Sequence, residues 1–103
     1  MIKIMVCCEA GVTSSKLVEA LKQEAQNNGI KLMIWSVARS GLSLSWSEAD
    51  CILLTPQISG SYNEVVATVN NSVAVLKIDE TAFIQCDATK ILSEALNSIK
   101  GQG

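Results

Sequence analysis

A short segment near the start of the chain places thiols before a run of small and hydroxyl residues. Cys7 and Cys8 directly follow the apolar run Ile2–Val6, and a helical pattern of apolar residues begins at Leu17. The residues that follow the thiols are Glu9, Ala10, Gly11, Val12, Thr13, Ser14 and Ser15. Because backbone N–H groups at a helix start bind anions, this order predicts a thiol beside a site for an anion such as phosphate.

Cys8 is the thiol placed for chemistry, because Cys7 still belongs to the apolar run and ends the expected strand. The thiolate is the nucleophilic form of cysteine, and a helix N-terminus favours it. A phosphoryl group on Cys8 would need several hydrogen-bond donors for its oxygens. The segment offers the N–H groups of residues 10–15, a close backbone approach at Gly11, and the hydroxyls of Thr13, Ser14 and Ser15. Without Cys8 a plain helix cap would explain these residues; with Cys8 an anion site is favoured.

The chain contains no histidine, which removes whole classes of site. No Ser-His or Cys-His pair can form, so most triad hydrolases are excluded. Zinc would have to be held by cysteines alone, and the four cysteines lack the C-x-x-C spacing of paired ligands. We therefore expect no metal site. Cys51 and Cys86 should be reduced thiols that pack as small buried hydrophobes.

The position of the only arginine separates two kinds of phosphate chemistry. A Cys-x5-Arg loop is typical of tyrosine phosphatases and arsenate reductases, but Ser14 stands six residues after Cys8, and the only arginine is Arg39. Efficient hydrolysis needs an arginine clamp and an acid that protonates the leaving group. Acids are available at Asp79, Glu80 and Asp87. Since nothing supplies the clamp, a loop that accepts a phosphoryl group and hands it on is favoured over a phosphatase-like enzyme.

Strands and helices alternate along the chain, and these elements must position the thiol. Short apolar, β-rich runs predict strands at Ile2–Cys7, Lys31–Val37, Cys51–Leu54 and Val73–Ile78. Apolar residues at helical spacing predict helices over Leu17–Ala25, stopped by Asn28-Gly29, over Tyr62–Val69, and over Ile91–Ile99 with Asp87 as the N-cap. The serine-rich segment Arg39–Glu48 predicts a short helix or an irregular crossover, and residues 101–103 a frayed tail.

With 103 residues, the chain is expected to form a single domain over residues 1–103. The alternating elements predict an α/β fold in three layers, with right-handed crossovers, a four-stranded parallel sheet and helices on both faces, of flavodoxin- or phosphatase-like type. If the strand order is 2-1-3-4, ligands bind beyond the carboxyl ends of the first and third strands. The Cys8 loop and the loop that contains Pro56 and Gln57 would then flank one crevice.

The charge and composition of the chain limit the classes of partner that it is expected to bind. The formal net charge is −2 and the basic residues are scattered singly, so we expect no nucleic-acid binding. The chain has no uncharged apolar run of 18 residues, so we expect no insertion into a membrane. The N-terminus lacks the basic, apolar and cleavage regions of a secretory signal. These features predict a cytoplasmic protein.

Three segments of the chain carry a resemblance to a known family. They are Cys8–Ser15, Leu53–Ile58 and Val75–Asp79. They resemble, in that order, the C-x-A-G-M-S-T-S loop, the L-L-G-P-Q-I segment after the third strand, and the V-x-V-I-D strand end of the IIB components of the sugar phosphotransferase system, lactose/cellobiose branch. The nucleophile loop and the Pro-Gln loop at this spacing make the resemblance specific, and it spans essentially the whole chain.

The resemblance implies a step in a phosphoryl relay. A phosphohistidine on a IIA protein would donate to Cys8, and the phosphocysteine would pass the group to a sugar taken up by a membrane IIC component. The sugar would be a β-disaccharide such as cellobiose, chitobiose or lactose. The chain would associate with the membrane only through IIC. No metal or organic cofactor is required by this scheme.

Other assignments stay open on the residues alone. A IIB of the galactitol or ascorbate branch would have a more glycine-rich loop, and a low-molecular-weight phosphatase-like enzyme would have the missing arginine. An orphan regulatory or binding module that keeps the thiol is a further alternative. Glu9 departs from the family pattern, because a carboxylate that faced the phosphate would repel it. We expect the Glu9 side chain to point to solvent.

Overall fold

The computed structural model describes residues 2–9, 15–70 and 72–102, and its centre is a parallel sheet of four strands. The strands are β1 (Ile2–Cys8), β2 (Leu32–Ala38), β3 (Cys51–Leu54) and β4 (Ala74–Lys77), in the order β2-β1-β3-β4. This confirms the predicted order. The central strands β1 and β3 are buried on both faces, which explains their continuous apolar sequence.

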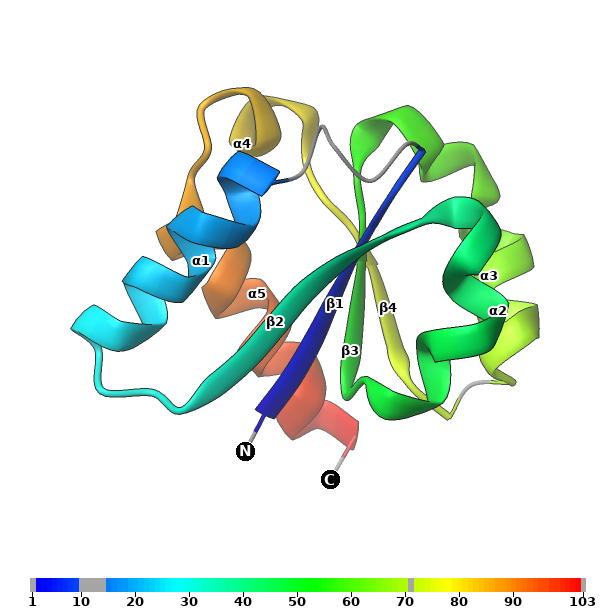
Figure 1. The fold of residues 1–103 in the computed structure, drawn as a ribbon, viewed down its shortest axis with the longest axis horizontal. Helices are drawn as coiled ribbons and strands as arrows, with labels where there is room; N and C mark the ends of the chain where they lie inside the picture. The colour runs from blue at the N-terminus through cyan, green and yellow to red at the C-terminus, as the bar shows by residue number, and fades with distance from the viewer. Residues whose placement is uncertain (1, 10–14, 71, 103) are drawn as a thin grey trace.

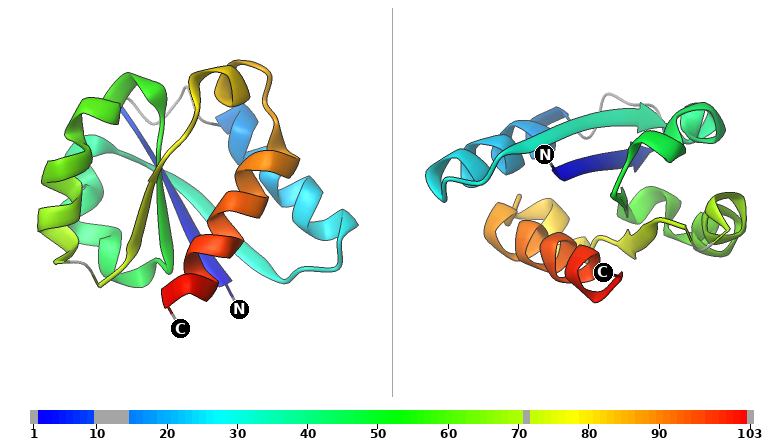
Figure 2. Two further views of the ribbon diagram at one scale, coloured as in Figure 1. Left: turned by 180° about the vertical axis from the view of Figure 1, so that it is seen from behind. Right: turned by 90° about the horizontal axis from the view of Figure 1, so that it is seen from below.

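Helices cover both faces of the sheet and complete three layers (Figure 1, Figure 2). One outer layer holds α1 (Ser15–Asn27), α4 (Glu80–Ile84) and α5 (Ala88–Gln102); the other holds α2 (Leu42–Ser45) and α3 (Tyr62–Val69). Short 3₁₀ helices η1 (Arg39–Gly41), η2 (Trp46–Glu48) and η3 (Pro56–Ser61) lie in the connections. The layers agree with the predicted fold class.

Side chains alternate along β1 between two separate cores. Ile4 and Val6 pack with α1 and α5, whereas Met5 and Cys7 pack with α2 and α3. This alternation follows from the pleat of a strand, where successive side chains point to opposite faces. Paired residues on neighbouring strands share a face, so Val6 and its partner Leu53 lie in the same core.

The ends of α1 and α5 follow local signals in the sequence. Gly29 adopts a left-handed conformation (φ 67°), and the N–H of Ile30 donates to the Ala25 carbonyl at 2.9 Å, which closes α1 as predicted. The Asp87 carboxylate accepts from the N–H of Lys90 at 3.2 Å, as expected of an N-cap. Helix α5 continues to Gln102, and Gly103 lies outside the described residues. The frayed tail expected at residues 101–103 stays a prediction.

Other boundaries differ from the prediction in ways that matter near the site. β1 runs one residue beyond its expected end and includes Cys8. The serine-rich segment after β2 forms η1, α2 and η2, so a short helix is confirmed there. The periodicity did not predict helix α4, because this helix is only five residues long. Its N-cap is Asp79, whose carboxylate accepts a hydrogen bond from the N–H of Ala82 at 3.1 Å.

Candidate functional site

Cys8 is the last residue of β1, at the carboxyl edge of the sheet. It is 0% exposed and pairs with Ala38 at the end of β2. Its Sγ donates a weak hydrogen bond to the Val37 carbonyl, with 3.8 Å between the atoms. Alternation along β1 places the Cys8 side chain on the face of Val6, which is the face that α1 covers. The thiol therefore lies on the same side of the sheet as the helix that begins at Ser15.

Cys7 lies on the opposite face, in the core with Leu54 and Val65. Burial raises the pKa of the Cys7 thiol to about 11, although the positive charge of Arg39 lowers this pKa and the neighbouring Cys8 raises it further. At neutral pH Cys7 is therefore a neutral thiol that points away from α1. This supports the expectation that Cys7 is structural.

The predicted anion loop is described only at its two ends. Glu9 is exposed, as expected of a carboxylate directed to solvent, and Ser15 is the first residue of α1. The predicted loop residues Ala10, Gly11, Val12, Thr13 and Ser14 lie outside the described residues. β1 ends at Cys8, one residue beyond its predicted end, and α1 begins at Ser15, two residues before the first predicted helical residue, Leu17.

Thr55 lies beside Cys8 on the neighbouring strand end and was not singled out by the sequence. Its N–H donates to the Cys7 carbonyl at 3.1 Å, which continues the β1–β3 pairing past Leu54. The Thr55 side chain is 0% exposed, and its Oγ1 has no hydrogen-bond partner among the described residues. A buried hydroxyl without a partner is unusual and is a signal that only the structure supplies.

Pro56 and Gln57 open η3 directly after Thr55 and line a hollow of about 320 Å³. Its other wall is α4, with Glu80, Phe83 and Ile84. Ile84 is 73% exposed, a large apolar side chain at the rim. This hollow lies between the Pro56-Gln57 loop and α4, and Cys8 is not among the described residues that line it. The crevice expected between the Cys8 loop and the Pro56-Gln57 loop stays a prediction.

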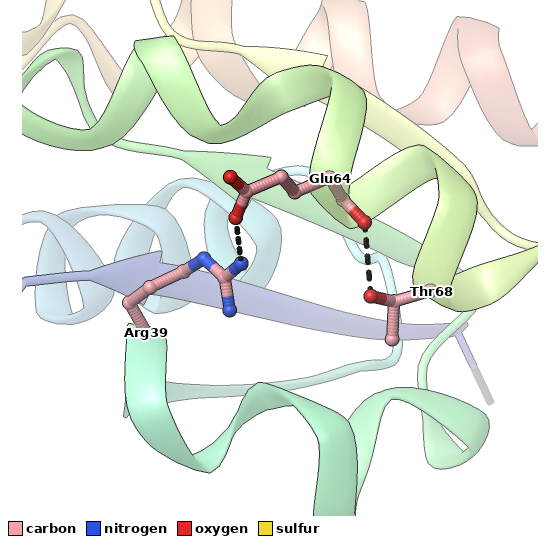
Figure 3. A network of polar contacts seen from close by, with 3 residues as sticks. All are labelled: Arg39, Glu64 and Thr68. Carbon is pink, nitrogen blue, oxygen red and sulfur yellow. Dashed lines mark hydrogen bonds and ion pairs between the residues drawn. The ribbon is translucent and has the colours of Figure 1, made fainter.

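Arg39 stands at the same edge of the sheet, because it follows Ala38 at the end of β2. Its guanidinium forms an ion pair with Glu64 of α3, with 2.9 Å between Nη2 and Oε2, while Thr68 donates to the Glu64 carbonyl (Figure 3). The pair lies on the side of the sheet that carries Cys7. The only arginine of the chain is therefore occupied on the far side of the sheet from α1.

The two remaining cysteines, Cys51 and Cys86, differ in burial. Cys51 is buried in the α1–α5 core, whereas Cys86 is only partly buried, contrary to our expectation, because it lies in the turn between α4 and α5. Within residues 2–9, 15–70 and 72–102, no three metal-binding side chains gather. No helix of the described ranges is long and apolar enough to cross a bilayer.

Comparison with known proteins places the chain in a family. Residues 3–94 match the model of the "PTS system, Lactose/Cellobiose specific IIB subunit" family. The chain is 30% identical over 101 residues to the oligo-beta-mannoside-specific EIIB component of the PTS system of Bacillus subtilis (strain 168), covering 97% of this chain and 98% of that protein.

Two solved structures share the fold. The lactose-specific IIB domain from Streptococcus pneumoniae has a TM-score of 0.82 at 20% identity, covering 91% of this chain and 96% of that one. The cellobiose-specific IIB protein from Borrelia burgdorferi also has a TM-score of 0.82, at 23% identity, covering 97% and 93%. With the sequence match over most of its length, the chain belongs to the lactose/cellobiose-specific IIB family of the sugar phosphotransferase system, a family of phosphotransferases.

Proposed function

We propose that Cys8 is the phosphoryl-carrying residue of this protein. The observation that carries the proposal is its place at the end of β1 on the face of α1, next to the switch in strand order between β1 and β3. Ligands of such sheets bind at this edge, and helix N-termini favour anions there. The segment 9–15 and the Pro56-Gln57 loop are the proposed surroundings of the phosphoryl group.

The proposed reaction has two transfers. In the first, the Cys8 sulfur attacks the phosphorus of a phosphohistidine on a IIA protein; the S–P bond forms, the P–N bond breaks, and its electron pair returns to the imidazole, which also takes the thiol proton. In the second, a sugar hydroxyl attacks, the O–P bond forms, and the S–P electrons return to sulfur with the hydroxyl proton. The transition state is stabilised chiefly by positioned donors around the equatorial oxygens.

Membership of the family supports the partners and the sugar that we propose. The proposed donor is a phosphohistidine on a IIA protein, which is consistent with the lack of histidine in this chain. The acceptor is a β-linked disaccharide such as cellobiose, chitobiose or lactose, delivered by a membrane IIC component. The B. subtilis relative is named as oligo-beta-mannoside-specific, which also points to a β-linked sugar. The protein works in the cytoplasm and meets the membrane through IIC.

The test is phosphorylation by phosphoenolpyruvate, the general phosphotransferase proteins and a IIA protein, followed by intact-mass analysis. We expect one added phosphate on the wild type and on Cys7→Ser, and none on Cys8→Ser. Cys7→Ser is the matched control, because it changes the adjacent thiol on the other face of the sheet.

The outcomes separate the alternatives. A label that persists in Cys8→Ser, or that disappears in Cys7→Ser, overturns the assignment of the carrier residue. Steady hydrolysis of a nitrophenyl phosphate favours the phosphatase-like enzyme. Failure with every IIA protein of the same genome favours an orphan regulatory module.

A further inference from the structure

The Thr55 hydroxyl is a buried hydrogen-bonding group that has no partner among the described residues of the unphosphorylated protein. Thr55 is fully buried, and Oγ1 is one of two buried side-chain polar atoms without a partner in the part of the chain that the structure describes. The other is Nε of Arg39, whose guanidinium is already held by Glu64. A buried hydroxyl without a hydrogen-bond partner lowers the stability of the folded state, so its presence calls for an explanation.

Register and face bring this hydroxyl to Cys8. Cys7 pairs with Leu54, so the next positions along the two strands, Cys8 and Thr55, lie side by side. The Thr55 backbone is still extended (φ −68°, ψ 158°), and therefore the alternation of faces continues through it. Leu53 lies in the core of α1 and α5, and Thr55, two residues on, faces the same way. Neighbouring strands are about 4.8 Å apart, so the two side chains are direct neighbours.

A structural role does not account for the hydroxyl. Thr55 precedes η3 at the N-cap position, but its side chain makes no capping hydrogen bond. The N–H of Ile58, which a cap would engage, donates instead to the Thr55 backbone carbonyl at 3.0 Å. On the other side of Cys8, the paired residue Ala38 has no polar side chain. Thr55 therefore supplies the hydroxyl at the strand ends that flank Cys8.

We infer that the Thr55 hydroxyl donates a hydrogen bond to a phosphoryl oxygen on Cys8 and so stabilises the transfer to and from the sulfur. The inference rests on the proposed function of Cys8. No proton is transferred by Thr55; its O–H only forms a new hydrogen bond to the charged phosphoryl group. The position is also the one at which Leu53–Ile58 differs from the L-L-G-P-Q-I pattern, so the donor is a feature of this chain.

The test compares Thr55→Val with Thr55→Ser. Valine keeps the shape and the β-branch but lacks the hydroxyl, whereas serine keeps the hydroxyl. Hydrogen bonds to charged groups correspond to rate effects of about 10- to 100-fold. We expect Thr55→Val to slow phosphorylation of Cys8 by a phosphorylated IIA protein by about that factor, and Thr55→Ser to remain within about threefold of the wild type.

Stability gives an independent measurement on the same variants. Because the hydroxyl is unpaired before phosphorylation, we expect Thr55→Val to have a urea midpoint equal to or above that of the wild type. A slower transfer with undiminished stability supports the inference. A wild-type rate in Thr55→Val, a slow Thr55→Ser, or a lowered urea midpoint in Thr55→Val overturns it. A wild type that takes no phosphate overturns the proposed function of Cys8, and the inference with it.

Discussion

The buried thiol of Cys51 should make the stability of this protein depend on alkaline pH. Cys51 opens β3 and is fully buried, and burial raises the pKa of its thiol to about 11 from an ordinary 9.0. The Asp50 carboxylate raises this pKa further, and a contact of 3.6 Å with the Ser98 hydroxyl lowers it. Because the folded-state pKa is the higher one, the stabilisation is complete below pH 9 and is lost as the pH rises through 11.

The size of the effect follows from proton linkage. At pH 10 the unfolded thiol is about 90% ionised and the folded thiol about 10%, so the folded state loses about 1 kcal/mol of stability relative to pH 7. The matched variant is Cys51→Ala, which has no thiol to titrate. It will be less stable at both pH values because a buried atom is lost. The effect of the thiol is therefore measured by the change in unfolding free energy between pH 7 and pH 10, compared between the two proteins.

The assay is urea unfolding under reducing conditions at pH 7 and pH 10, followed by helical circular dichroism. The wild type should lose about 1 kcal/mol more stability than Cys51→Ala between the two pH values. Other groups, including Cys7, titrate in both proteins, so their contributions to the change in stability cancel in the comparison. Equal losses in the two proteins would refute the reasoning, because they would mean that Cys51 ionises in the folded state as readily as in the unfolded chain.

Four further predictions concern the carboxyl edge and its supports. Asp79→Ala should destabilise the protein by about 1 kcal/mol in urea unfolding, since α4 loses its N-cap; an unchanged midpoint would show that the cap is not needed. Cys86→Gly should raise stability by up to about 1 kcal/mol, because Cys86 holds a positive φ of 53° that glycine tolerates, and a loss of stability would contradict this. Glu64→Gln should cost less than about 1 kcal/mol, with the difference shrinking in high salt, because the pair with Arg39 is partly exposed; a larger cost that persists in salt would indicate a buried pair. Glu9→Ala should leave the rate of phosphate acceptance unchanged, because Glu9 is exposed, and a large gain in rate would mean that its carboxylate faces the phosphoryl group.

Much of the fold was predictable because its signals are local. The central strands are continuous apolar runs, the first and last helices have clear apolar faces, and Gly29 and Asp87 mark helix ends. Helix α4 escaped because it spans only five residues, too few for a periodicity. Its N-cap at Asp79 was the signal that could have revealed it, but its end at Cys86 lacks the glycine that usually marks a helix stop.

The candidate site divides in the same way. The sequence placed Cys8 directly after a strand and before a helix, and it placed Pro56 and Gln57 after the end of another strand. It did not assign a role to Thr55, whose proposed role rests on burial and on the absence of a hydrogen-bond partner among the described residues. Nor did it show that Arg39 is engaged with Glu64, a contact between a strand end and a helix distant in the chain.

The segment Cys7–Ser15 by itself predicted thiols at the end of a strand and before a helix start, because residue types and their spacing specify that local order. Which thiol faces the helix, and which hydroxyl stands beside it, was decided only by the tertiary structure. Strand pleating separates Cys7 from Cys8, and pairing between β1 and β3 sets Thr55 next to Cys8. These relations depend on register and face, which arise only when strands distant in sequence pack against one another.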